Sequence, residues 1–180
     1  MDNALEEIAS SEQAAAPPPQ RLIEFLLPIV IVGVDQSTKA MVRASVPVHD
    51  SVTVIPGFFD ITHALNSGAA FGILNGADFP YKTVIIAVIA TAALIGVGMY
   101  AASLSHHQLI ARIGLALIIG GAAGNLIDRV MTGSVVDFVD VYWKTHHFWA
   151  FNVADSAISV GVTMLILDML TTGPHVSKTV

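Results

Sequence analysis

Two aspartates, Asp137 and Asp155, are the residues whose type and setting point most directly to chemistry. Asp137 lies in the connection between two apolar stretches, and Asp155 lies near the start of the second of them. Two close carboxylates cannot both ionise cheaply, so they share one proton and supply an acid and a base at neutral pH. Such a pair can activate water for attack on an amide carbon without a metal or a nucleophilic side chain. In the alternative reading, Asp137 is a surface loop residue and Asp155 is a helix-start residue favoured by the helix dipole.

Further polar residues have spacings that place them on shared helix faces. Asn152 precedes Asp155 by three residues, so both side chains can point at the same place. Asp35 precedes Lys39 by four residues, the favourable acid-first order for a helical ion pair, which predicts a structural role for both.

A second polar group ends the third apolar stretch, where Asn125 is followed by Asp128 and Arg129. It could bind a substrate backbone or headgroup, or Asp128 and Arg129 could simply neutralise each other at the membrane edge. Another candidate segment combines Asn66 with Gly68 and further small residues. Small residues allow a substrate strand to approach closely, but the glycines are also typical of turns.

The composition is that of an integral membrane protein. The chain of 180 residues is 54% hydrophobic and only 12% charged, with a mean hydropathy of +0.70, whereas soluble domains are about 25% charged. The net charge of -6 argues against nucleic acid as a partner. Because the chain has no cysteine, disulfides, thiolate catalysis and cysteine-ligated zinc are excluded. The histidine pairs lack a zinc-ligand spacing, so no metal or other cofactor is expected.

Four stretches reach the length of about 20 apolar residues that a membrane helix needs, and they predict an all-α membrane protein with helices over 22–41, 83–102, 110–131 and 151–170. Alternating β-type runs predict a small extramembrane β subdomain over 42–82, between the first two helices. The connection 132–150 carries aromatic residues that favour the membrane interface. We expect one helical domain over 21–171, an acidic and proline-containing disordered tail over 1–20, and a C-terminal tail over 172–180.

Four crossings bring the polar residues together. Both ends of the chain then lie on one side, and the connections 42–82 and 132–150 share the other side. The polar residues named above all lie at the helix ends that face those two connections or in the connections themselves. Three lysines and arginines lie on the side of the chain ends and five on the other side, a count slightly adverse to a cytoplasmic N-terminus. Setting aside Lys39 and Arg129 as site residues leaves three on each side, so the positive-inside rule does not decide the orientation.

Two other functions are compatible with membrane carboxylates. A small proton-coupled transporter would use them as a relay, but it predicts polar residues in both halves of the bilayer. A scaffold held together by small-residue packing over 120–124 predicts that Asp137 and Asp155 tolerate asparagine. A peptidase predicts nearly complete loss of activity from either change.

Five segments resemble the motifs of the bacterial lipoprotein signal peptidases, signal peptidase II, an aspartic peptidase family. They are Asp-Gln-Ser-Thr-Lys at 35–39, Asn-Ser-Gly-Ala-Ala-Phe-Gly at 66–72, Gly-Asn-Leu-Ile-Asp-Arg at 124–129, Val-Val-Asp-Phe at 135–138 and Phe-Asn-Val-Ala-Asp-Ser at 151–156. All five stand in the family's order, and the resemblance covers about 22–170.

The resemblance implies an inner-membrane protease with both termini cytoplasmic and its site near the periplasmic face. It implies that Asp137 and Asp155 are the catalytic pair, and that the other site residues are Asp35, Lys39, Asn66, Gly68, Asn125, Asp128, Arg129 and Asn152. The implied substrate is a diacylglyceryl-modified prolipoprotein that is cut just before its lipidated cysteine. The other implied partners are membrane lipid and an inhibitor of the globomycin class of cyclic peptides, and the expected active unit is a monomer.

Overall fold

The computed structural model describes residues 19–69, 73–77, 79–104 and 108–172. Its helices are α2 (Pro19–Ser45), α3 (Lys82–Ser103), α4 (Leu109–Thr132) and α5 (Val153–Thr172). In this part of the chain, four helices are long and apolar enough to cross a membrane, which confirms the prediction of four spans. The first helix begins before residue 22 and continues past residue 41, so its sheet-side end extends beyond the predicted span. The predicted tails lie outside the described residues, except for 19–20 and 172, which belong to helices.

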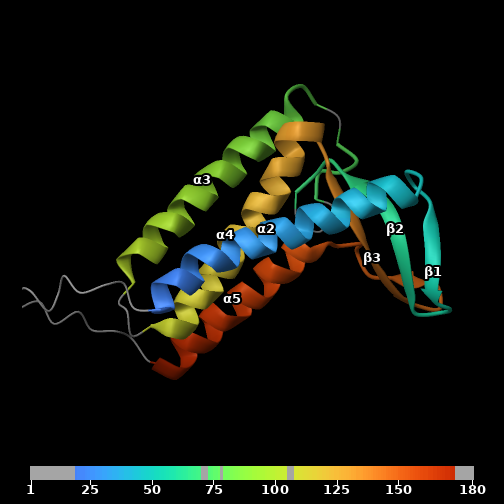
Figure 1. Ribbon diagram of the computed structural model, residues 1–180. Helices are drawn as coiled ribbons and strands as arrows, with labels where there is room; N and C mark the ends of the chain where they lie inside the picture. Colours follow the sequence, from blue (N-terminus) through green and yellow to red (C-terminus); the bar gives the residue numbers. More distant parts are fainter. Residues whose placement is uncertain (1–18, 70–72, 78, 105–107, 173–180) are drawn as a thin grey trace, which may run out of the picture.

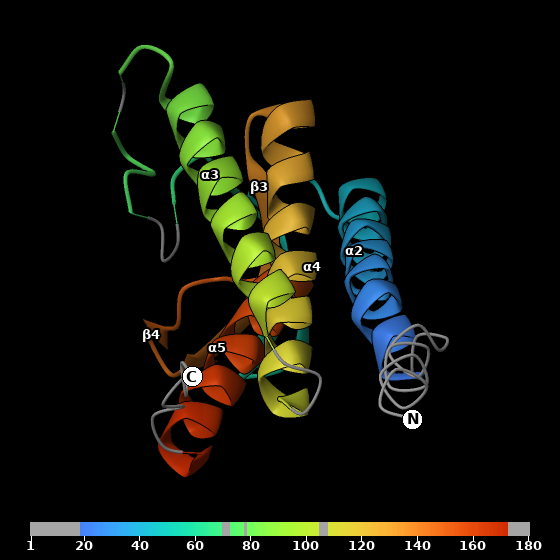
Figure 2. The ribbon, with the colours of Figure 1, turned by 90° about the vertical axis from the view of Figure 1, so that its left-hand side faces the viewer.

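α4 is the central helix of the bundle. It packs against α2, α3 and α5, and Figure 2 shows α2 and α3 on opposite sides of it. Its buried residues include several glycines, which allow neighbouring backbones to approach closely. α3 lies on the outside, and Ile86 is its one buried residue. Because α3 is apolar on all sides, its exposed surface suits contact with lipid.

An antiparallel sheet lies beyond one end of the bundle (Figure 1). Its order is β1 (Ser51–Ile55), β2 (Phe59–Asn66), β3 (Val135–Trp143) and β4 (His146–His147). The first two strands confirm the predicted β-type connection. The connection 132–150 supplies the other two strands, which were not predicted from the sequence. Asp137 therefore lies on a strand that is hydrogen-bonded to β2, and not in an irregular loop.

The sheet is fixed to the end of α2 by apolar packing. Val42 of α2 and Val46, the residue that follows α2, form a buried cluster with Val136 and Phe138 of β3. His63 of β2 is also buried, and its Nδ1 lies 2.8 Å from the Val46 carbonyl oxygen. Val136 and Phe138 flank Asp137, so burying them fixes the position of that carboxylate relative to α2.

The α4–α5 interface predicts a strong sensitivity at Gly161. A Cβ added there would lie 2.4 Å from the Gly114 carbonyl oxygen, so the Gly161→Ala helix would have to shift away from α4. We expect this overpacking to lower the free energy of unfolding by about 1–3 kcal/mol. The measurement is unfolding of the purified protein in detergent micelles.

Gly98→Ala is the matched control, because a Cβ at Gly98 of α3 meets nothing within 4 Å. That variant should be as stable as the wild type or slightly more stable, since alanine favours helix more than glycine does. Equal stability of the two variants would contradict the packing described for α4 and α5.

Candidate active site

Asp137 and Asp155 come from different elements and meet at Asn152. Asn152 donates from Nδ2 to Asp137 Oδ1 at 2.7 Å. Its Oδ1 accepts the Asp155 backbone N–H at 2.9 Å, and Asp155 Oδ2 accepts the Asn152 backbone N–H at 3.2 Å. This reciprocal pair is the pattern of a capping box at the start of α5. The same two hydrogen bonds therefore begin the helix and orient the Asp155 carboxylate.

Two more asparagines complete the contacts of the carboxylates. Asn66, at the end of β2, donates to Asp137 Oδ2 at 3.1 Å. Asn125 of α4 donates to Asp155 Oδ1 at 2.8 Å, and its own Oδ1 accepts from Asn152 at 3.1 Å. Each of the four carboxylate oxygens thus accepts a hydrogen bond from an amide group, so both side chains are held in fixed orientations.

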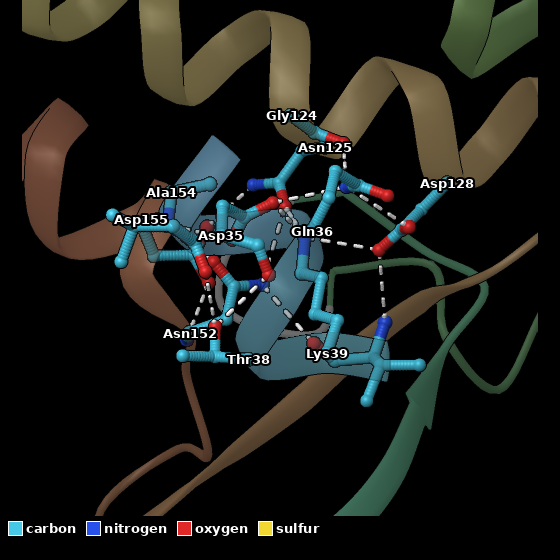
Figure 3. A network of polar contacts seen from close by, with 12 residues as sticks. Asp35, Gln36, Thr38, Lys39, Gly124, Asn125, Asp128, Asn152, Ala154 and Asp155 are labelled. Atoms are coloured by element: carbon cyan, nitrogen blue, oxygen red, sulfur yellow. Dashed lines mark hydrogen bonds and ion pairs between the residues drawn. The ribbon is translucent and has the colours of Figure 1, made fainter. Parts of the chain in front are cut away.

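Lys39 of α2 contacts one of these amides, that of Asn125, and two further carboxylates (Figure 3). Its side chain is fully buried, and Nζ contacts Asp35 at 2.8 Å, Asp128 at 2.9 Å and Asn125 Oδ1 at 2.9 Å. Asp35 also accepts the Ala154 backbone N–H at 3.0 Å. The predicted Asp35–Lys39 ion pair is confirmed, and it connects α2 to both α4 and α5.

The suggested mutual pairing of Asp128 and Arg129 is wrong. Asp128 pairs with Lys39 and with Arg43, whose Nη2 lies 2.8 Å from Asp128 Oδ1. Arg129 instead donates to two backbone carbonyl oxygens, those of Asn125 at 3.1 Å and Gly68 at 2.9 Å. Neighbouring charged residues on one helix can each interact with a different element, and here α2 supplies both cations that pair with Asp128.

Two contributors were not singled out from the sequence. Arg43 lies one helical turn beyond Lys39, and this spacing on the face of α2 is a signal that could have identified it. Gln36 bridges the helices by donating to Asp35 Oδ2, to the Gly124 carbonyl oxygen and to Asp128 Oδ1. Nothing in the spacing of Gln36 distinguishes it from an exposed polar residue.

Gly68, in the segment that follows β2, lies very close to the backbone of Ile73 and Asn75. A Cβ at Gly68 would lie 2.3 Å from the Ile73 carbonyl oxygen, so only glycine fits this position without a shift of the backbone. Gly68 also donates its N–H to Asn66 Oδ1 at 3.0 Å. Residues 70–72 of the motif lie outside the described residues. One connected set of contacts joins all ten site residues named from the sequence: Asp35, Lys39, Asn66, Gly68, Asn125, Asp128, Arg129, Asp137, Asn152 and Asp155.

Burial sets the protonation of Asp137. The residue is 4% exposed. Desolvation is the main cause that raises its pKa, the nearby Asp155 charge raises it further, and the hydrogen bonds from Asn66 and Asn152 lower it, with a resulting pKa of about 7. A carboxyl that exchanges its proton near neutrality beside a second carboxyl suits general acid and base catalysis.

Comparisons with known proteins agree on one family. The family model described as signal peptidase (SPase) II matches residues 27–171. A protein of Geobacter metallireducens named lipoprotein signal peptidase is 44% identical over 153 residues, which cover 85% of this chain and 93% of that protein. One of the same name from Solibacter usitatus is 49% identical over 144 residues, which cover 78% of this chain and 86% of that protein.

The fold of this chain resembles those of solved structures. A structure described as a bacterial membrane enzyme superposes with a TM-score of 0.72 at 30% identity, covering 83% of this chain and 94% of the other. A second structure with the same description also has a TM-score of 0.72, at 32% identity, and covers 84% of this chain and 92% of the other.

Removing the Lys39 ammonium should destabilise the protein severely. Lys39→Met leaves Asp35 and Asp128 buried with one fewer cation, and an uncompensated buried charge costs about 3–5 kcal/mol. Unfolding in detergent micelles measures this loss. Arg43→Met is the control, because its side chain is 32% exposed and Lys39 still pairs with Asp128. We expect the control to cost about 1 kcal/mol. Similar losses for the two variants would show that Lys39 is not the main counter-charge.

Proposed function

This chain belongs to the signal peptidase II family of membrane-embedded peptidases, and we propose that it cleaves diacylglyceryl-modified prolipoproteins just before the lipidated cysteine. Removal of signal peptides from bacterial prolipoproteins follows from the family. The chemical step is our assignment: Asp137 and Asp155 form the catalytic pair. The buried Asp137 carboxylate and the half-buried Asp155 carboxylate, both held by amide donors, carry this proposal.

The pair holds one proton when it is active. The ionised carboxylate takes a proton from water, and the resulting hydroxide attacks the carbonyl carbon of the scissile amide. The protonated carboxyl donates to the carbonyl oxygen as negative charge develops there. The carboxyl that took its proton from water then gives that proton to the amide nitrogen, and the other carboxylate takes a proton back from a hydroxyl of the tetrahedral intermediate. The C–N bond breaks, the C=O bond re-forms, and the amine leaves. Asn66, Asn125 and Asn152 keep both carboxylates in the geometry that this exchange requires.

The remaining site residues divide into two roles. We assign a structural role to Asp35, Lys39 and Asp128, because their contacts hold α2, α4 and α5 together next to Asn125. We assign Asn66, Gly68, Asn125, Arg129 and Asn152 to the substrate side, beside the two aspartates. Ala64 pairs with Asp137 across the sheet, and it also lines an open pocket of about 360 Å³ with Thr62, Asp140, His147, Phe148, Trp149 and Ala150. We propose that the peptide lies along this pocket.

A lipidated substrate accounts for the position of the site. Its acyl chains remain in the bilayer, so the scissile bond is presented near the membrane surface. The candidate site lies at the sheet end of the bundle, and the described start of α2 and end of α5 lie at the opposite end (Figure 1). We propose that the protein resides in the inner membrane, that both termini are cytoplasmic, and that the sheet is periplasmic. We further propose that the enzyme acts as a monomer without a cofactor, and that globomycin-class cyclic peptides inhibit it.

The transporter alternative is not favoured. A transporter requires a polar path through the bilayer. At the end of the bundle far from the sheet, the charged residues Glu24 and Arg112 pair with each other. Arg112 also donates to the Leu104 carbonyl oxygen at 2.8 Å, so its contacts join α2, α4 and the end of α3. These contacts suit a structural link.

A gel-shift cleavage assay tests the proposed chemistry. Purified protein in detergent is given a diacylglyceryl-modified prolipoprotein, beside Asp137→Asn and Asp155→Asn variants whose folding is verified. We expect cleavage by the wild type and a fall of at least about 1,000-fold for each variant, since each removes one half of the acid–base pair. Undiminished cleavage by either variant would overturn the two-aspartate mechanism. A parallel reaction with unmodified prolipoprotein tests the requirement for the lipid and should give no product.

The pH dependence of kcat tests the role of Asn66. Because the pKa of Asp137 is about 7, we expect kcat to fall as the pH rises through that value and the pair loses its proton. The Asn66 hydrogen bond favours the ionised form of Asp137, so Asn66→Ala should raise the pKa and move this alkaline limb to higher pH. The exposed Thr53 on β1 provides a control, Thr53→Ala, which should leave the limb in place. A downward shift for Asn66→Ala would contradict the assigned contact.

A further inference from the structure

Lys82 occupies a place where a cation is unfavourable for its own helix. It is the first residue of α3, and the first turn contains no acidic residue. The positive end of the helix dipole repels a cation there. The residue before it, Tyr81, has a φ of 63° and provides no side-chain cap. The helix itself therefore gains nothing from this lysine, which suggests that its ammonium serves a neighbouring segment.

The Lys82 ammonium is directed at the segment that follows β2. Nζ donates to the Ala77 carbonyl oxygen at 2.8 Å and to Ser67 Oγ at 3.0 Å. The carbonyl oxygens of Asn75 and Leu74 lie at 3.3 and 3.4 Å. One charged group thus gathers acceptors from both sides of the segment, at 67 and at 74–77. Hydrogen bonds from an ionised donor are about twice as strong as neutral ones.

A short series of contacts continues from this cluster to the catalytic strand. Asn75 Oδ1 accepts from the Ser67 backbone N–H at 2.9 Å and from Ser67 Oγ at 3.1 Å. Gly68 packs directly against the Asn75 backbone and donates its N–H to Asn66 Oδ1. That bond leaves Asn66 Nδ2 pointing at Asp137 Oδ2. The orientation of Asn66 is therefore set by residues that Lys82 holds.

We propose that Lys82 is a positioning residue for the peptidase reaction, which acts by fixing residues 66–68 so that Asn66 donates to Asp137. The inference rests on the proposed function, because it takes Asp137 as catalytic. Lys82 does not touch the reacting atoms. The charged groups that do face Asp137 are Asp155 on α5, Lys39 on α2 and Arg129 on α4, and none of them lies on α3.

The test is a double-mutant cycle between Lys82→Met and Asn66→Ala, measured as kcat against pH under single-turnover conditions with excess enzyme. In the wild-type background we expect Lys82→Met to lower kcat about 10-fold, because small displacements of a catalytic group have effects of this order. It should also move the alkaline limb to higher pH, in the same direction as Asn66→Ala. In the Asn66→Ala background, Lys82→Met should change kcat less than about twofold and leave the limb in place.

Matched variants separate positioning from loss of charge. Lys144 is exposed and lies in the β3–β4 connection at the sheet end, so Lys144→Met removes the same charge and should retain wild-type kcat. Ser67→Ala keeps the Lys82 charge but removes one of its hydrogen-bond acceptors. It should lower kcat about threefold and, like Lys82→Met, move the alkaline limb of the pH dependence to higher pH. Lys82→Arg should recover part of the activity.

Two results would overturn the proposal. One is a fall in kcat from Lys82→Met that is as large in the Asn66→Ala background as in the wild type. Such a fall would show that Lys82 acts through its charge at a distance and not through Asn66. The other is a kcat for Lys82→Met equal to that of Lys144→Met. Reactions of the wild type and of Asp137→Asn are run alongside. If the wild type cleaves the substrate and Asp137→Asn does not, the proposed function is supported whatever the result for Lys82, so failure of the Lys82 proposal is distinct from failure of that function.

Discussion

A fully buried ammonium group is the interaction on which the rest of this structure depends. Lys39 lies among Asp35, Asp128 and Asn125, at distances of 2.8 to 2.9 Å. Two ionised carboxylates are costly to bury in an apolar bundle unless cations lie beside them. With Arg43 the two carboxylates and two cations balance to zero. This neutral cluster allows the asparagines above it to be packed, desolvated and rigid.

The two carboxylates that we propose to be catalytic are placed by different kinds of structure. Asp155 belongs to a helix start, where its capping hydrogen bonds with Asn152 fix its direction. Asp137 belongs to a strand whose neighbours Val136 and Phe138 are buried against α2. Asn152 contacts both and makes them one unit. Asn125 in turn joins this unit to the buried Lys39, so the proposed chemistry and its support meet at the same amide.

Much of this arrangement could be predicted from the sequence because hydropathy and spacing are local signals. The four spans follow from apolar length, and their alternating direction brings the polar ends to one side. The strand containing Asp137 was missed because its pairing with β2 joins segments about 70 residues apart, and alternation in so short a run did not stand out. The pairing of Asp128 with Arg129, one of two alternatives left open by the sequence, was also wrong. Local spacing offered Arg129, whereas tertiary packing supplied Lys39 and Arg43 from α2.

The proposed mechanism requires Asp137 and Asp155 to hold one proton between them near neutrality, and infrared difference spectroscopy between pH 6 and pH 9 can detect that proton. We predict a protonated-carboxyl C=O band at pH 6 that disappears on titration with an apparent pKa of about 7. The band should be lost in Asp137→Asn and weakened in Asp155→Asn, because removing the neighbouring charge lets Asp137 ionise more readily. A wild-type spectrum without a protonated carboxyl at pH 6, or a band unchanged in both variants, would contradict the shared-proton mechanism.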